Sequence, residues 1–218
     1  MAEATPSQIE PIPGEPGVYF NHATGRKFRL VEFRDTSKYD TIELESGTTD
    51  TANGQEQEFF QTVANKNLND LNLKTARRIS KGEDMLVRWL GVQIPLAVGN
   101  TLVAPVDVKK VADTAYLKFS INEFLIDEGP LSKFPSGYGI AGQTTENATG
   151  IATIGVPSTA ARQNLAKWHY ITSDHDLEAT IKFQARAWMT TAYSAPSLAT
   201  VVLVRFHVGG LVGKAATK

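Results

Sequence analysis

The chain is dominated by segments in which apolar and polar residues alternate. The longest runs from Leu177 to Ala187, where every second residue is apolar. Because successive side chains of a strand point to opposite faces of a sheet, this pattern predicts a half-buried strand. Similar alternation predicts strands at Leu117 to Ile121, at Leu86 to Ile94 and at Val201 to Val208. The last is rich in valine and is expected near the centre of a sheet.

The strand from Leu86 to Ile94 is expected to turn Leu86, Leu90, Val92 and Ile94 toward one apolar face, around Arg88 and Gln93. Shorter strands are predicted at five further segments. They are Gly17 to Phe20, Lys27 to Phe33 with a bulge at Leu30 and Val31, Tyr39 to Glu45, Thr101 to Val108, and Trp168 to Thr172.

Helix signals are few. Gln55 to Leu73 could hold one helix, although its asparagines favour turns, and Ser158 to Trp168 could form a short helix within a connection. Many strands joined by loops, with one or two short helices, predict an all-β fold, an antiparallel β-sandwich. We expect a jelly roll or a related Greek key. A single jelly roll fits the length better than a double one, since the two halves show no repeat.

Prolines at 11, 13 and 16 predict that neither helix nor sheet runs through the beginning of the chain. We therefore expect residues 1–16 to form an extended or disordered N-terminal arm, which in its extended form could swap onto a neighbouring copy. Residues 17–212 are expected to form the β-sandwich, and residues 213–218 a C-terminal tail.

Composition narrows the classes of function. The 218 residues carry 22 basic and 23 acidic side chains, so no global field attracts nucleic acid, and sequence-specific nucleic-acid binding is not expected. Cysteine is absent, which excludes disulfides and thiolate chemistry. The first residues resemble no targeting signal, so the glycosylation sequon at Asn147 is interpreted as a chance match. No apolar run is long enough to span a bilayer.

Candidate chemical motifs lack the context that their chemistry needs. Gly137 to Gly142 matches G-x-G-x-x-G, but it follows no strand and opens no helix, so it is read as a loop and not as a cofactor site. His169, Asp174, His175 and Asp176 have metal-ligand side chains at a spacing that fits no common metal motif, and the two aspartates are expected to serve a turn.

Other groups are read as structural. The acidic pairs Glu83–Asp84 and Asp127–Glu128 are expected at solvated loop edges, and the cluster of Lys74, Arg77, Arg78 and Lys81 as a solvated or subunit-facing patch. Trp89, Trp168 and Trp188 could line a sugar platform or belong to the core or an interface. We expect no catalytic, cofactor-binding or metal-binding residue, no cofactor and no enzyme activity.

Several segments together resemble a known family. They are Asn65 to Leu73, Ile79 to Arg88 with the strand ending at Ile94, Glu128 to Leu131, Phe134 to Gly139, and Val202 to Gly210. In this order they are similar to the jelly-roll coat proteins of tailless icosahedral bacteriophages.

The resemblance implies a structural virion protein, a capsid subunit that assembles into an icosahedral shell in the host cytoplasm. Its implied partners are copies of itself, in trimeric or higher capsomers, and other virion proteins, sometimes over an internal lipid membrane. Two alternatives remain open: a carbohydrate-binding sandwich or receptor-binding spike domain, and a cupin-like metalloenzyme with its metal at His169 to Asp176.

Overall fold

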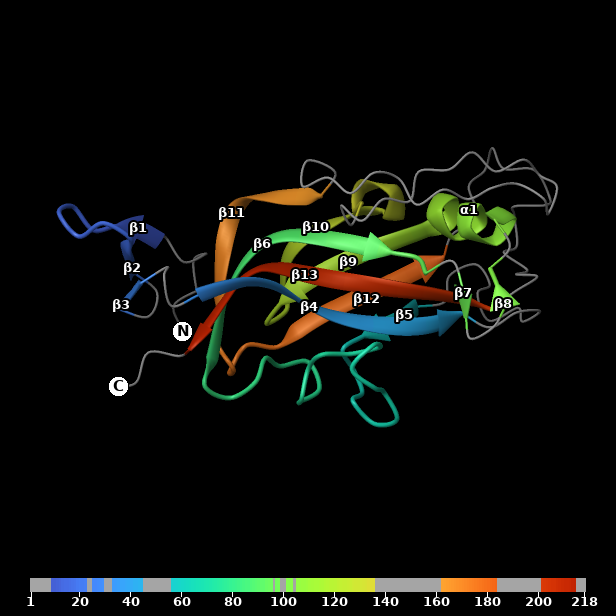
Figure 1. The fold of residues 1–218 in the computed structure, drawn as a ribbon. Helices are drawn as coiled ribbons and strands as arrows, with labels where there is room; N and C mark the ends of the chain where they lie inside the picture. Colours follow the sequence, from blue (N-terminus) through green and yellow to red (C-terminus); the bar gives the residue numbers. More distant parts are fainter. Residues whose placement is uncertain are drawn as a thin grey trace.

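The computed structural model describes residues 9–22, 25–29, 33–44, 56–95, 97–98, 101–103, 105–135, 162–183 and 201–214. Most of these residues belong to antiparallel sheets, and the two largest sheets have four strands each (Figure 1). The predicted all-β antiparallel architecture is therefore confirmed.

The first sheet has the strand order β11-β6-β13-β4, and the second has the order β10-β9-β12-β5. The strands of the first sheet are β4 (Phe33–Leu44), β6 (Glu83–Gln93), β11 (Gln163–Ile171) and β13 (Val202–Lys214). Those of the second are β5 (Glu56–Phe59), β9 (Ala115–Ile121), β10 (Phe124–Pro130) and β12 (Leu177–Phe183).

The long predicted strands are confirmed where the structure describes them. β13 lies between β6 and β4, as its valine-rich sequence predicted, and it continues to Lys214. β12 buries every second residue from Leu177 to Phe183, while residues 184–187 of the predicted strand lie outside the described ranges.

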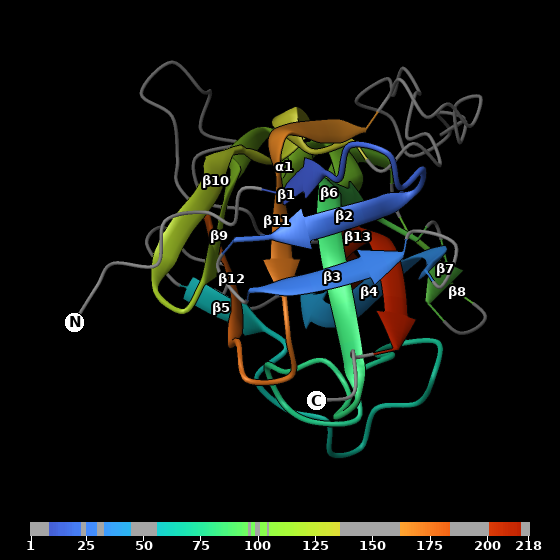
Figure 2. The ribbon, with the colours of Figure 1, turned by 90° about the vertical axis from the view of Figure 1, so that its left-hand side faces the viewer.

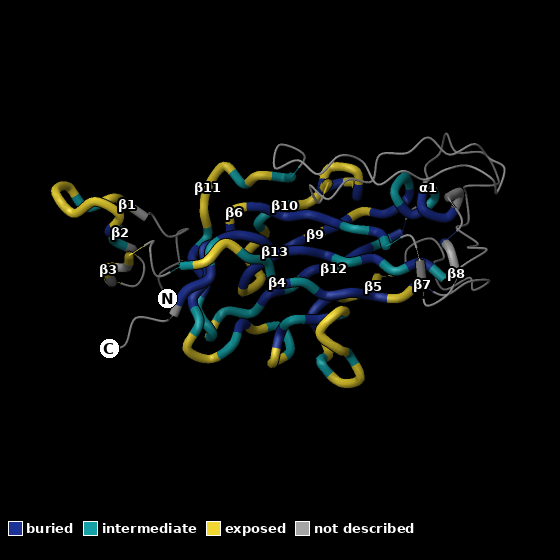
Figure 3. Tube along the Cα trace, in the orientation of Figure 1, coloured by how far each residue is buried: buried dark blue, intermediate teal, exposed yellow. Residues whose placement is uncertain are grey.

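Apolar side chains from both sheets form the main core. Figure 3 shows β6 and β13 of the first sheet buried along most of their length. Phe206 lies at the centre of this core, with its ring centroid 5.5 Å from that of Phe119 and 5.6 Å from that of Phe59. These rings come from β13, β9 and β5, so one aromatic cluster joins both sheets. Truncation of such a buried phenylalanine typically costs about 3–5 kcal/mol of stability.

A small third sheet lies outside the sandwich. It is formed by β1 (Ile9–Pro11), β2 (Val18–Asn21) and β3 (Arg26–Arg29), and Figure 2 shows β2 and β3 crossing the direction of β6. Tyr19 packs on a second apolar cluster that contains Leu86 and Tyr170. The expectation that prolines keep this segment out of a sheet is wrong at residues 9–11, because Pro11 ends an edge strand.

The helix predicted at Gln55 to Leu73 is not present. Glu56–Phe59 forms β5, and the backbone then turns through Phe60 and Asn65, whose φ angles of 64° and 61° are incompatible with a helix. The amide of Phe60 donates a hydrogen bond of 2.5 Å to the buried carboxylate of Asp40, and this carboxylate also forms an ion pair with Lys66. Tertiary contacts therefore determine this segment.

Two other assignments are also wrong. Within Ser158 to Trp168, the described residues from Gln163 onward form strand β11, because they pair with β6. Within Thr101 to Val108, Thr101–Leu102 pairs as the short strand β8 with β7 (Ala97–Val98), and α1 (Pro105–Thr114) begins at a proline, which is favoured in the first helical turn. A short 3₁₀ helix, η3, spans Leu131–Lys133.

The outer edge of the first sheet, at β4, is covered by the asparagine-rich loop from Asn65 to Leu73. Asn72 accepts the amide of Tyr39 through Oδ1 at 2.8 Å and donates through Nδ2 to the carbonyl of Ser37 at 2.7 Å. The side chain thus takes the place that a neighbouring strand would occupy beside β4. This contact protects the edge against pairing with another chain.

Within the described ranges no helix has the length and apolar character needed to cross a membrane.

Candidate functional site

A bulge in β6 directs two large side chains away from the core. Val87 and Leu90 both belong to the main core, so the two residues between them cannot follow the usual alternation. In the register with β13, Gly209 pairs with Trp89 and Gly210 with Val87, so Arg88 is the extra residue. Arg88 and Trp89 therefore both lie on the outer face of the first sheet.

The same bulge corrects the expected face of the strand. Leu90, Val92 and Ile94 belong to the main core, whereas Leu86, before the bulge, packs on the outer face against Tyr170. The bulge is visible in the sequence as a change in the phase of the alternation, because the core positions Met85 and Val87 are followed by core positions at Leu90 and Val92.

The indole of Trp89 lies directly over the backbone of β13. A Cβ atom added to Gly209 would meet ring atom Cε2 at 1.8 Å, so no side chain can be present beneath the ring. The guanidinium carbon of Arg162 lies 4.3 Å from the ring centroid. Covered in this way, Trp89 is 6% exposed and offers no open ring to a sugar.

A second Arg–Trp pair stands beside the first. The guanidinium carbon of Arg88 lies 4.6 Å from the ring centroid of Trp168, which β11 carries and which is 36% exposed. Stacking on an aromatic face orients the planar donors of arginine.

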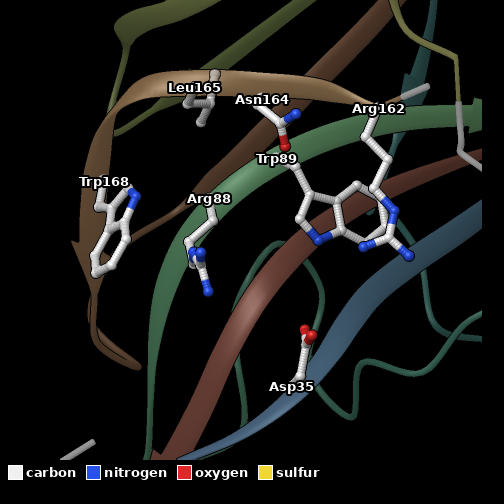
Figure 4. Close-up of a pocket in the computed structure, with 7 residues that line it drawn as sticks. All are labelled: Asp35, Arg88, Trp89, Arg162, Asn164, Leu165 and Trp168. Carbon is white, nitrogen blue, oxygen red and sulfur yellow. The ribbon is translucent and has the colours of Figure 1, made fainter. Parts of the chain in front are cut away.

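The two pairs line a hollow of about 290 Å³ (Figure 4). Its lining residues are Asp35, Arg88, Trp89, Arg162, Asn164, Leu165 and Trp168. Among the described residues the structure records no ion pair for either guanidinium, and the buried Nε of Arg162 has no hydrogen-bond partner. With two arginines and Asp35 as its charged groups, the hollow has an excess of one positive charge. We call it the Arg–Trp hollow.

Aromatic and basic side chains continue across the outer face. His207 lies between Trp89 and Tyr39, with centroid distances of 6.2 and 5.5 Å, and Arg205 lies over Tyr39 at 5.3 Å. Burial lowers the pKa of His207 to about 4, with further lowering by the charges of Arg205 and Arg162. The imidazole is therefore neutral at pH 7.

His169 lies in strand β11, and residues 172–176 connect β11 to β12, so Asp174 and Asp176 lie in a turn between two strands, as the sequence predicted. Nδ1 of His175 accepts the amide of Thr172, and Asp176 pairs with Arg78 at 2.6 Å. Burial lowers the pKa of both His169 and His175. In the described ranges no group of His, Asp or Glu side chains could hold a metal ion.

Two members of the basic cluster, Arg77 and Arg78, form ion pairs with residues in or next to the second sheet. Arg77 contacts Glu58 of β5 at 2.5 Å and Glu178 of β12 at 3.8 Å, while Arg78 contacts Asp176. These contacts fasten the loop before β6 to the second sheet. The hydrogen bond to Arg78 also lowers the pKa of Asp176.

Asp84 and Asp127 are not solvated loop residues, which corrects the expectation for one member of each acidic pair, whereas Glu128 is exposed. Asp84 is 3% exposed and accepts the hydroxyl of Tyr170, and Asp127 lies in β10, where Lys133 and Gln163 contact it. The glycine-rich loop from Gly137 to Gly142, the sequon at Asn147 and Trp188 lie outside the described residues.

Large apolar side chains are also exposed at the tip of the hairpin that joins β9 to β10. Phe124 is 55% exposed and Leu125 is 42% exposed. The turn residues Asn122 and Glu123 have φ angles of 50° and 67°, which is typical of a tight type I′ hairpin. The tip is fixed to the next turn, since Asn122 donates its amide to the carbonyl of Asp176 and accepts the amide of Asp176 through Oδ1.

The sequence alone did not indicate Arg162 or the hairpin tip. Arg162 lies far along the chain from Trp89, and the two meet because β11 pairs with β6. No protein-family model matches the chain, and no curated protein or solved structure is significantly similar to it.

Proposed function

We propose that this protein is a virus coat subunit, a single jelly roll that assembles with copies of itself into an icosahedral shell. The strand order carries the proposal. If the eight strands of the two large sheets are numbered along the chain, the sheets read 6-3-8-1 and 5-4-7-2. This order, with two interlocking Greek keys, is typical of jelly rolls, which occur in viral capsids, lectins and cupins.

The packed interior favours a structural role over an enzymatic one. A site between the sheets would need a cavity of a few hundred Å³ with converging polar groups. Here the rings of Phe59, Phe119 and Phe206 fill that space. Chemical recognition is therefore a matter of the outer faces, edges and loops.

The outer face of the first sheet has the residue types of protein interfaces. Trp, Tyr and Arg are enriched among the side chains that contribute most to association, and this face carries Trp89, Trp168, Tyr39, Arg88 and Arg162. The proposal of a coat protein also depends on the resemblance of several sequence segments to the jelly-roll coat proteins of tailless icosahedral bacteriophages. It implies capsomers of three or more copies in a virion, with other virion proteins as partners.

Negative-stain electron micrographs of the purified full chain test the proposal. We expect trimers, larger rings or closed particles. A homogeneous population of single 23.7 kDa molecules would contradict it, and stoichiometric binding to a glycan array by those molecules would favour the carbohydrate-binding alternative.

A further inference from the structure

The Arg–Trp hollow presents two guanidinium groups for which the structure records no ion pair among the described residues. Arg88 and Arg162 are each stacked on an indole, and Asp35 is the acidic residue in the lining. A guanidinium fork matches the planar geometry of a carboxylate, and its stacking reduces the entropy lost on binding. A hollow with a net charge of plus one matches a ligand with a single carboxylate.

The hairpin tip has the complementary features. Glu123 is an exposed carboxylate for which the structure records no ion pair among the described residues, and it stands beside the exposed Phe124 and Leu125. The hydrogen bonds between Asn122 and Asp176 hold the tip in place before it meets a partner. A rigid segment loses little entropy when it docks.

From this complementarity we infer that the β9–β10 hairpin tip of one copy docks in the Arg–Trp hollow of the next. Glu123 pairs with Arg88 and Arg162, while Phe124 packs against Trp168. The tip and the hollow are different surfaces on different sheets, so where each copy offers its tip to one neighbour and its hollow to another, the contact is head-to-tail and generates a ring or an extended array. This inference rests on the proposed function, since it specifies how the copies join.

Charge reversal tests the pairing. Arg88→Glu changes the net charge of the hollow from plus one to minus one, so it gives copies in which both the tip and the hollow are acidic, and Glu123→Arg gives copies in which both are basic. Because like charges at an interface cost several kcal/mol, each variant alone should associate roughly tenfold or more weakly than the natural chain in sedimentation experiments. The double variant should recover association, and so should an equal mixture of the two single variants.

Lys81→Glu is the matched control, because Lys81 is an exposed residue in the loop before β6. It should assemble as the natural chain does. The inference is overturned if the single variants assemble normally, or if neither the double variant nor the mixture recovers association. If the natural chain itself never associates, the proposed function fails instead.

Cross-linking gives a second measurement that does not depend on charge reversal. The chain has no cysteine, so Arg88→Cys and Glu123→Cys introduce single reactive sites. A mixture of the two should give dimers with a short bismaleimide, and Lys81→Cys with Glu123→Cys should not. Equal yields from both mixtures would overturn the inference. Free inorganic phosphate gives a further outcome. If phosphate bound in the hollow, and Arg88→Glu abolished this binding without changing assembly, the ligand of the hollow would be a small anion and the inference would be overturned.

Discussion

At the scale of single residues, the outer face of the first sheet depends on a glycine beneath an indole. Arg88 and Trp89 both point outward because the bulge adds one residue to β6, and the ring of Trp89 needs the space that a side chain at position 209 would fill. The guanidinium of Arg162 lies over the same ring. The position of Trp89, and of the guanidinium of Arg162 over its ring, therefore depends on a glycine at position 209 of β13.

Gly209→Ala should destabilise the fold by about 2 kcal/mol, because overpacking of a closed site typically costs about 1–3 kcal/mol. Urea unfolding followed by circular dichroism measures the change. In a Trp89→Leu background the same substitution should cost less, since the clash is with the indole. Equal costs in both backgrounds would contradict the packing described for this site.

His207 should make the fold less stable in acid. Its pKa is about 4 in the folded protein, below the ordinary value of 6.5, so protonation favours the unfolded chain. Its contribution is fully present above pH 6.5 and is lost as the pH falls toward 4, by about 3 kcal/mol in total. His207→Gln should flatten the dependence of the unfolding free energy on pH over this range. An unchanged slope in the His207 variant would contradict the assignment.

At the scale of elements, the sequence predicted the regularly alternating strands and failed where contacts distant in sequence decide. β9, β12 and the core face of β13 follow alternation because one face of each strand is buried. The segment after β5 could not be predicted, because the buried Asp40 holds the amide of Phe60 and the side chain of Lys66.

The candidate site was predicted only in part, for the same reason. Trp89 and Trp168 stood out in the sequence, but their relation to Arg162 depends on the pairing of β11 with β6. Alternation also gave Leu86 the wrong face, since a bulge shifts the phase without changing the residue types around it.

The asparagine-rich loop should be required for the closed edge of β4. Asn72→Ala removes two hydrogen bonds to the backbone of this strand and should cost about 1–3 kcal/mol, because polar groups of the edge lose their partner. Thermal unfolding measures the loss, and light scattering should show faster aggregation through the exposed edge. Asn69→Ala, in the same loop but exposed, is the control and should behave as the natural chain. Equal behaviour of the two variants would argue against edge protection by Asn72.

At the scale of the whole molecule, the filled interior provides stability, while the outer surfaces carry the candidate groups for recognition. The aromatic cluster around Phe206 joins the two sheets, while the covered edge at β4 limits unplanned pairing. Among the residues that the structure describes, the candidates for recognition are the outer face with its Arg–Trp hollow and the hairpin tip with Phe124 and Leu125. These features support the proposal that the molecule makes specific contacts with its own copies.

The mass of the full chain in solution tests this account most directly. Sedimentation velocity over a range of concentrations should show species of three or more copies, with larger assemblies as the concentration rises. A single species at 23.7 kDa, unchanged at every concentration, would contradict the central claim that the surface of this sandwich is completed by identical copies.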